Sequence, residues 1–466
     1  MNNLTDINKI DFKKIRKVHF IGIGGISMSG LAEILLSKNY TISGSDTTPS
    51  ELTRKLENAG VKISYTQQAS NITDDIDLTV YTAAISEDDP ELVASTNKNI
   101  PTIPRAELLG LIMKQYKHAI GVSGTHGKTS TTSMISQILL EAETDPTILV
   151  GGMMGAIGGN LRIGHSDTMI TEACEYTNSF LSFNPTTAVI LNISEDHMDF
   201  FKDIDDIRHS FKKFADLVPE VGTVVLNKDI DNLSYFTDNL SCKVITFSAT
   251  DNSADITAAN ISYNNMACGS FDLVHNGNVL THINLKVIGL HNISNALAAA
   301  ATAISIGIPV EIIKRGLEIF TGTARRFEYK GELNGVTIVD DYAHHPDEIT
   351  ATLSTAVNYP HKKLWCVFQP HTYTRTKAFF DGFVESLSLA DAVVLADIYA
   401  AREQNTVGIS SEDLYKAIAK TGKEAYYFPS FDEIEKFLLK NCKKGDLLIT
   451  MGAGNVVNIG NNLLKM

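Results

Sequence analysis

Short apolar runs alternate with longer amphipathic segments along almost the whole chain. Runs such as KVHFIGIG, which begins at Lys17, and TAVILNIS, which begins at Thr187, are typical of buried strands. The segment SMSGLAEILLSKN predicts a helix, and the alanine-rich stretch 296–310 predicts another that ends near Gly307 and Pro309. Strands that alternate with helices predict an α/β fold with mostly parallel sheets.

Two interruptions of this alternation divide the chain into three parts. The segment IPTIPRAELLG, residues 100–110, contains two prolines and is predicted to be a crossover, and FTGTARRFEYKGELNG, residues 320–335, breaks the pattern again. We therefore predict domains at 1–112, 113–322 and 323–466. Within the second domain, residues 249–285 alternate in polarity between Gly and Asn turns, which predicts a small antiparallel element.

Composition narrows the class of partner. The 466 residues include 40 basic and 54 acidic side chains, with a net charge of −14 and no long basic run, which argues against nucleic acid and membranes as partners. The five cysteines are far apart and form no C-x-x-C pair, so we expect reduced thiols in a cytoplasmic protein without a structural zinc. The polar N-terminus and the lack of a long apolar stretch predict neither a signal peptide nor a membrane span.

The glycine-rich loop after the first predicted strand indicates a diphosphate site. Glycines there let a phosphate approach backbone N–H groups at a helix N-terminus. Asp46 follows at the distance where an acid meets a ribose hydroxyl, but Ser27 stands at the third glycine position of the dinucleotide motif. The loop alone leaves open whether the ligand is NAD or a nucleotide sugar. Its predicted ligand-binding residues are Gly22, Gly24, Gly25, Ser27 and Asp46.

A second glycine loop, GVSGTHGKTSTT, predicts an ATP site. It differs from a strict P-loop because Val122 stands where the first glycine is expected, with Gly121 beside it. Lys128 can reach the β- and γ-phosphate oxygens, and the Thr129 hydroxyl can bind Mg²⁺. The predicted nucleotide-binding residues of this loop are Gly124, Thr125, His126, Gly127, Lys128, Thr129 and Ser130.

Acidic side chains and a histidine follow two later apolar runs. Glu172 and Glu175 lie in ITEACEYTNSF, and Asp196, His197 and Asp199 lie in LNISEDHMDFF. Magnesium prefers oxygen ligands and keeps several waters, so one carboxylate near the phosphates is enough. His197 can act as a metal ligand or can orient its loop.

Taken in order, these segments resemble the Mur ligases of peptidoglycan synthesis. The resemblance runs from about residue 18 to about residue 455. It rests on HFIGIGGISMSG with SGSD, GTHGKTSTT, Glu172, DHMD around His197, GLHNISNALAA, ARRF, DDYAHHP, QPHTYTRT and DIYAARE.

The resemblance implies a three-domain ATP-dependent ligase. Its N-terminal domain is Rossmann-like and binds the UDP part of a substrate, its central domain is of the P-loop ATPase type, and its Rossmann-like C-terminal domain closes on the site and binds an amino acid. The implied reaction joins L-alanine to the lactyl carboxylate of UDP-N-acetylmuramate through an acyl phosphate, with ATP and Mg²⁺. We expect a cytoplasmic monomer or weak homodimer.

The resemblance also implies roles for single residues. Lys128, His197 and Arg326 are the expected catalytic residues, and Thr129, Glu172 and His197 the expected metal ligands, with Glu175 as the alternative carboxylate. Asn292, Asn295, Arg326 and Asp341 are expected at ATP; capping is the alternative for the asparagines, and a turn role is the alternative for Asp341. Tyr342, His345 and Arg375 are expected at the amino acid. The neighbouring Arg325 could be a surface charge, and one of His344 and His345 could cap the helix that follows.

The chain departs from the family pattern at Thr372, where many members have arginine after the histidine of QPH. Arg375 remains and is predicted to pair with the amino acid carboxylate. Three alternatives stay open: another amide ligase, acting on a recycled peptide or on folate; an NAD-dependent oxidoreductase; and a nucleotide-sensing protein. The oxidoreductase leaves the second loop unexplained, and a sensor does not need the acids, the histidine and the distal arginine together.

Overall fold

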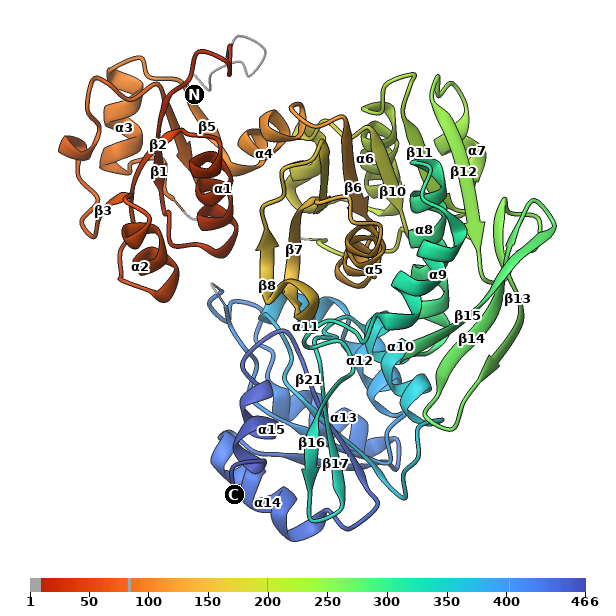
Figure 1. The fold of residues 1–466 in the computed structure, drawn as a ribbon. Helices are drawn as coiled ribbons and strands as arrows, with labels where there is room; N and C mark the ends of the chain where they lie inside the picture. Colours follow the sequence, from red (N-terminus) through yellow and green to blue (C-terminus); the bar gives the residue numbers. More distant parts are fainter. Residues whose placement is uncertain (1–9, 83–84, 199, 402) are drawn as a thin grey trace.

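Three sheets form three lobes of the molecule (Figure 1). The structure is a computed structural model and describes residues 10–82, 85–198, 200–401 and 403–466. Most neighbouring strands are parallel and are connected through helices, so the predicted α/β fold is confirmed. None of the helices in these residue ranges combines the length and the apolar character that crossing a bilayer requires.

The N-terminal sheet is parallel, with strand order β3-β2-β1-β4-β5. Strands β2 and β3 are added on one side of β1, and β4 and β5 on the other, so the strand order reverses beside β1. Strands β1 and β4 in its interior are almost entirely buried, as expected when helices cover both faces, whereas the edge strand β3 is partly exposed. The elements are β1 (Lys17–Ile21), α1 (Ile26–Ser37), β2 (Thr41–Ser45), α2 (Glu51–Asn58), β3 (Lys62–Ser64), η2 (Ala69–Asn71), β4 (Leu78–Tyr81), α3 (Pro90–Asn97) and β5 (Thr102–Pro104).

The central sheet has ten strands in the order β15-β14-β13-β12-β11-β10-β6-β9-β7-β8. Its parallel middle supports the second glycine loop. Strand β13 pairs in parallel with β12, and the β13–β14 and β14–β15 pairs that follow are antiparallel. The elements are β6 (His118–Ser123), α5 (Lys128–Glu141), β7 (Thr147–Met154), η3 (Gly155–Ile157), β8 (Gly159–Arg162), β9 (Thr168–Glu172), η4 (Tyr176–Ser182), β10 (Thr187–Ile190), α6 (Ile204–Asp216), β11 (Thr223–Asn227), α7 (Leu233–Thr237), β12 (Lys243–Ser248), β13 (Ile256–Tyr263), β14 (Cys268–His275), β15 (Asn278–Ile288), α8 (Leu290–Ser305) and α9 (Val310–Ile319).

The C-terminal sheet has the order β16-β17-β21-β18-β19-β20 and is parallel except for β16. The elements are β16 (Glu328–Leu333), β17 (Val336–Asp341), α10 (Pro346–Ala356), β18 (Leu364–Phe368), α11 (Tyr373–Ala378), α12 (Phe380–Leu387), β19 (Ala392–Leu395), α13 (Ser411–Lys420), β20 (Glu424–Tyr427), α14 (Phe431–Asn441), β21 (Leu447–Met451) and α15 (Val457–Leu463). This sheet has its own buried clusters on its two faces.

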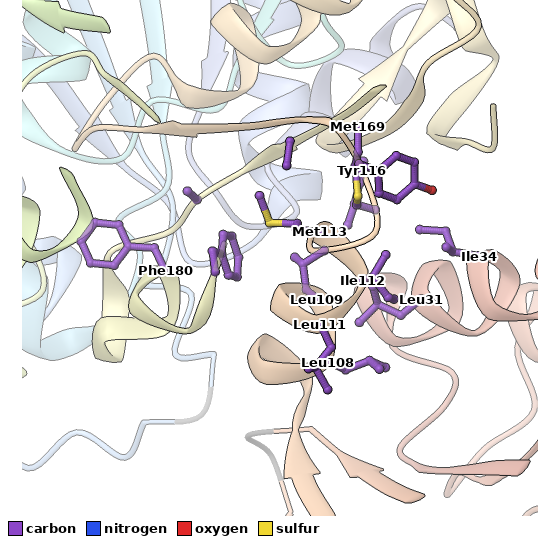
Figure 2. Close-up of a cluster of buried hydrophobic side chains, with 14 of the residues drawn as sticks. Leu31, Ile34, Leu108, Leu109, Leu111, Ile112, Met113, Tyr116, Met169 and Phe180 are labelled. Carbon is purple, nitrogen blue, oxygen red and sulfur yellow. The ribbon is translucent and has the colours of Figure 1, made fainter. Parts of the chain in front are cut away.

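Helix α4 (Arg105–Met113) joins the first two lobes through a shared core (Figure 2). One continuous buried cluster includes residues of the N-terminal lobe, of α4 and of the central lobe. Its labelled members in Figure 2 are Leu31, Ile34, Leu108, Leu109, Leu111, Ile112, Met113, Tyr116, Met169 and Phe180. Gly110 brings α4 so close to η4 that a Cβ atom on it would lie 1.9 Å from the Ser182 carbonyl oxygen.

The structure differs from the sequence-based expectations at three places. The predicted crossover at 100–110 contains strand β5 and helix α4. Its prolines are compatible with both elements, because Pro101 precedes β5 and Pro104 is the last residue of β5 and the N-cap of α4. The antiparallel element is confirmed, but it is continuous with the central sheet. The irregular segment 320–335 contains β16, which pairs at the edge of the third sheet. The domain boundaries themselves remain predictions.

Candidate functional site

The second glycine loop connects β6 to α5 in the middle of the central sheet. Gly124 and Gly127 have φ angles of 147° and 84°, which only glycine adopts without strain. A side chain at Gly127 would also lie 2.7 Å from Asn295 Oδ1, so the loop packs directly on α8. Asn192, which sequence analysis did not select, braces the loop: its Oδ1 accepts from the His126 N–H at 2.8 Å. The N-terminus of α5 is thereby presented to a phosphate.

Lys128 is held inside this loop by Glu175. Its Nζ donates to Glu175 Oε2 at 3.0 Å and to the carbonyl oxygens of Gly124 and Thr125. Burial alone would lower the pKa of Lys128, but the Glu175 carboxylate overcomes this and raises it. The lysine is therefore charged at neutral pH.

Glu172, in contrast, faces open space at the carboxyl end of β9. Its Oε1 accepts from the Gly151 N–H at 2.6 Å, and it lines a cavity together with Thr129 and His197. Because β10, β6 and β9 are adjacent parallel strands, their carboxyl ends bring these three side chains together. Of the two candidate carboxylates, Glu172 is the one exposed to this cavity.

His197 follows β10, and its ring stacks on Tyr176 with ring centroids 4.4 Å apart. Burial lowers the pKa of His197 despite the neighbouring Asp196, so the imidazole is neutral and can offer a lone pair. Asp199, the other acid of this segment, lies outside the described residues.

Asp196 pairs with Arg375 across the boundary between the central and C-terminal lobes. Arg375 Nη2 donates to Asp196 Oδ1 at 3.0 Å, and both side chains are about nine-tenths buried. Burial would raise the pKa of Asp196, but the Arg375 guanidinium holds it well below its usual range. Thr372 is the N-cap of α11 beside this pair and has a φ of 64°, unusual for a β-branched residue.

Seven of the eleven predicted nucleotide-binding residues line a cavity of about 270 Å³, here named cavity I, while Thr125, Lys128 and Thr129 line the cavity that contains Glu172. It is lined by His126, Ser130, Asn292, Asn295, Arg326 and Asp341, and on its apolar side by Leu191, Ile288, Phe327 and Ala351. Gly289, not an asparagine, is the N-cap of α8, while the Asn292 amide donates to the Ile288 carbonyl. Burial raises the pKa of Asp341 to about 6, although Arg326 opposes the shift.

The histidines of the C-terminal lobe have distinct positions. His345 is 4% exposed, and its Nδ1 accepts from the Asp347 N–H as the N-cap of α10, which is the capping alternative. His344 lines the cavity that contains Lys128.

His126, in the glycine loop of the central lobe, contacts Glu348 Oε1 at 3.2 Å. Burial would lower the pKa of His126, but the Asp347 and Glu348 carboxylates raise it to about 9.

Arg325 is not a surface charge, contrary to the alternative considered from the sequence. Its Nε donates to Asp340 Oδ2 at 2.9 Å, and its terminal nitrogens donate to the carbonyl oxygens of Gly452 and Gly454. It therefore fixes the start of the C-terminal lobe. Arg326, next to it, lines both cavity I and the cavity that contains Lys128.

The first glycine loop follows β1 as predicted and opens α1. Asp46 Oδ2 accepts from the Gly24 N–H at 2.8 Å, and its Oδ1 accepts from the Thr47 N–H at 2.8 Å. Gly25 is the N-cap of α1 without a side-chain cap, and Ser27 lies in its first turn. The structure thus gives Asp46 a bracing role in the loop and leaves backbone N–H groups of the helix N-terminus for a ligand.

Two further cavities lie beside cavity I and share lining residues with it or with each other. Cavity II, of about 420 Å³, is lined by Lys128, Thr129, Glu172, His197, Tyr342 and His344, and it shares His126 and Arg326 with cavity I. Cavity III, also about 420 Å³, is lined by Tyr176, His371, Thr372, Arg375 and Glu403, and it shares Asp196 and His197 with cavity II. A nucleotide, a phosphorylated group and a small zwitterion could therefore be bound in sequence.

Three family models match the chain in order. The model described as "Mur ligase family, catalytic domain" matches residues 17–117, "Mur ligase middle domain" matches 122–303, and "Mur ligase, glutamate ligase domain" matches 325–454.

Curated relatives match along almost their full length. A UDP-N-acetylmuramate–L-alanine ligase of Lachnospira eligens is 57% identical over 457 residues, which are 98% of this chain and 100% of the relative. A ligase of the same name from Acetivibrio thermocellus is 50% identical over 462 residues, 99% of this chain and 98% of the relative.

Solved structures share the fold. UDP-N-acetylmuramate-alanine ligase from Thermotoga maritima matches with a TM-score of 0.79 and 29% identity, covering 96% of this chain and 98% of that one. A murein peptide ligase from Psychrobacter arcticus matches with a TM-score of 0.69 and 26% identity, covering 97% and 98%.

Proposed function

The chain belongs to the Mur ligase family, and from that premise we propose that it joins L-alanine to the lactyl carboxylate of UDP-N-acetylmuramate while ATP is converted to ADP and phosphate. It is thus an ATP-dependent acid–amino-acid ligase of peptidoglycan precursor synthesis. The observation that carries the proposal at the site is that cavities I, II and III adjoin one another through shared lining residues, since the reaction needs a nucleotide, a carboxylate and an amine close together.

The chemistry requires activation of the carboxylate. A carboxylate does not condense with an ammonium ion in water, whereas an acyl phosphate has a good leaving group that a neutral amine can displace. No side-chain nucleophile is needed, so positioning and charge neutralisation supply the rate enhancement. Cavities that share lining residues suit this chemistry, because the γ-phosphate, the carboxylate and the amine must meet without intervening water.

Phosphoryl transfer takes place in cavity II. Lys128 leaves Glu175 to contact the transferring phosphate, and Arg326, shared by cavities I and II, neutralises developing charge. The adenine nucleotide lies in cavity I, where Asn292, Asn295 and Asp341 contact it and apolar side chains cover the base.

The donor set in cavity II fits Mg²⁺, since the Thr129 hydroxyl and the Glu172 carboxylate are hard oxygen ligands and His197 offers a neutral imidazole. These three residues would hold the ion, which when bound offsets negative charge on the phosphates. Glu172 is already oriented by the Gly151 N–H, so this chain presents the carboxylate before any ligand arrives.

The amino acid binds in cavity III. Arg375 takes its carboxylate, and Asp196, freed from that arginine, takes its ammonium group, so a zwitterion replaces an internal ion pair. Tyr342, which lines cavity II, is assigned to the amino acid, and His345 supports α10 as its N-cap. The UDP diphosphate binds the first glycine loop through backbone N–H groups around Gly22, Gly24, Gly25 and Ser27, with Asp46 bracing the loop. We place the enzyme in the cytoplasm.

The test is phosphate release by the purified chain with Mg²⁺-ATP and UDP-N-acetylmuramate, with L-alanine, glycine, L-serine or a peptide as the acceptor. Release that requires both the sugar nucleotide and L-alanine supports the proposal and shows that Thr372 is compatible with alanine. Release with a peptide but not with L-alanine indicates a recycling ligase instead. A folded protein without release for any acceptor contradicts ligase activity.

A further inference from the structure

A buried imidazole nitrogen at the boundary of the central and C-terminal lobes lacks a partner. His126 Nε2 is inaccessible and has no hydrogen-bond partner among the described residues, while His126 Nδ1 lies 3.2 Å from Glu348 Oε1. Because the Asp347 and Glu348 carboxylates raise the pKa of His126 to about 9, the ring carries both protons at neutral pH. An ion that binds Nε2 displaces the Nε2 proton, while Nδ1 keeps its proton toward Glu348. An unpaired buried polar atom costs about 1–3 kcal/mol, so a water or an ion is the expected partner.

Two further donors surround this nitrogen. Asp347 Oδ2 lies 3.8 Å from His126 Nε2 and 3.7 Å from His345 Nδ1. The potential ligand atoms of the three residues all lie within 4.8 Å of one another. His345 makes only a long bond, 3.3 Å from the Asp347 N–H to its Nδ1, and its Nε2 has no partner among the described residues, so either nitrogen can serve.

We propose that His126, His345 and Asp347 form a binding site for a zinc-class divalent transition-metal ion that bridges the glycine loop of the central lobe and the first turn of α10. Two imidazoles and a carboxylate are the donors of three-ligand zinc sites, which keep a fourth position open. Magnesium prefers oxygen ligands, so this site differs in chemistry from Thr129 and Glu172 in cavity II.

The geometry is close to what such an ion needs. Zinc–nitrogen bonds of about 2.0–2.1 Å place tetrahedral ligand atoms about 3.4 Å apart. The two measured separations from Asp347 Oδ2 exceed this by a few tenths of an ångström, and the Asp347 side chain is 59% exposed and can rotate inward. Glu348 supplies the carboxylate behind His126 that commonly orients a metal-binding imidazole.

Occupancy has a mechanical consequence. His126 belongs to the central lobe and the other two ligands to the C-terminal lobe, so the ion links the two lobes in the arrangement of this structure. His126 and Asp347 also line cavity I, so the bound ion restricts entry of a nucleotide. The inference does not depend on which amino acid the enzyme uses.

The test is a Co²⁺ titration of the untagged full-length chain after chelator treatment, without nucleotide, followed by visible absorption, and then competition with Zn²⁺. We expect one tight equivalent with the intense visible bands of a low-coordinate site, displaced by Zn²⁺. His126→Asn and Asp347→Asn should each weaken binding at least about tenfold. His165→Asn is the matched control, because His165 also pairs with an aspartate but is 90% exposed and lies elsewhere.

Fold integrity is checked by thermal unfolding of every variant in chelator. Zn²⁺ should raise the midpoint of the wild type and of His165→Asn but not of the other two variants. Equal affinity in all four proteins, or no stoichiometric binding by a folded wild type, overturns the proposal. Because no substrate is present, neither result bears on phosphate release, so failure here is separate from failure of the ligase assay.

Discussion

Lys128 and Glu175 form a buried pair in which each residue depends on the other. The Lys128 side chain is 17% exposed and that of Glu175 only 3%. Removing one member of such a pair leaves an uncompensated buried charge, which costs about 3–5 kcal/mol.

We therefore expect Lys128→Met to lower both activity and stability. Phosphate release should fall about 10³-fold or more, and the free energy of unfolding by about 3–5 kcal/mol. The double variant Lys128→Met/Glu175→Gln should recover most of the stability and none of the activity. Denaturant unfolding and phosphate-release assays on both variants check this. A double variant as unstable as the single one would show that the pair is not the cause.

Asp341 makes stability depend on pH. Its pKa is raised by burial to about 6, above the usual value of 3.8, so the folded state binds a proton more readily than the unfolded state. The stabilisation is fully present below about pH 4 and is lost as pH rises through about 6. Asp341→Asn cannot titrate, so wild type should gain up to about 3 kcal/mol relative to the variant between pH 7 and pH 4. Urea unfolding at several pH values measures the difference; parallel profiles would contradict the raised pKa.

At the scale of single residues, the sequence could predict those candidate site residues that belong to local motifs. Lys128 and Thr129 were predicted because a strand, a glycine turn and a helix fix their positions within a few residues, and Glu172 was predicted because it directly follows an apolar run. The Asp196–Arg375 and His126–Glu348 contacts join residues 179 and 222 positions apart, and no local pattern encodes how two lobes dock. The sequence analysis placed His345 at the amino acid and not His344, whereas in the structure His344 lines cavity II and His345 caps α10.

Among the glycines of the described residues, Gly110 on α4 leaves the least room for a side chain. Gly110 on α4 has no room for a side chain because the Ser182 carbonyl of η4 lies where a Cβ atom would be. The missing side chain allows α4 to contact both the N-terminal and the central lobe.

Gly110→Ala should therefore destabilise the molecule by roughly 1–3 kcal/mol or more, although alanine is the better helix former. Gly155→Ala is the control, because a Cβ atom there meets open space. Thermal unfolding of the two variants checks the prediction. A midpoint for Gly110→Ala equal to that of the control would mean that α4 and η4 separate readily.

Element prediction succeeded where burial sets the pattern. Parallel strands such as β10 and β11 are continuous apolar runs because helices cover both faces. Strand β16 was missed because an edge strand is half exposed and carries charged residues and a glycine, EYKGEL, which look like a loop.

Across the whole molecule, the lobes are joined in two ways. The first two share an apolar core, whereas the C-terminal lobe meets the central one through ion pairs such as Asp196–Arg375 and His126–Glu348. Polar interfaces within a chain commonly permit domain motion. Closure by movement of the C-terminal lobe is therefore the expected conformational step.

Asp196→Asn should loosen closure and weaken alanine binding together. We expect the KM for L-alanine to rise about 10–100-fold with the KM for ATP changed less than about threefold, since one charge of the zwitterion site is lost. Small-angle scattering should show a larger radius of gyration for the ligand-free variant. Glu403→Gln, which alters another acid of cavity III, is the control. Equal changes in both KM values would indicate general damage.

The shared core through α4 also limits where lobes could be exchanged between this enzyme and its relatives. A chimera that takes its N-terminal lobe from another family member must also take α4 and the facing segment at Ser182, because Gly110 of α4 leaves no room for a side chain beside the Ser182 carbonyl oxygen. The C-terminal lobe, which has its own apolar clusters, can be exchanged as an independent module at the connection between α9 and β16. Because Tyr176, Asp196 and His197 of the central lobe also line cavity III, such an exchange is expected to transfer amino acid specificity only where the central lobe presents the same side chains.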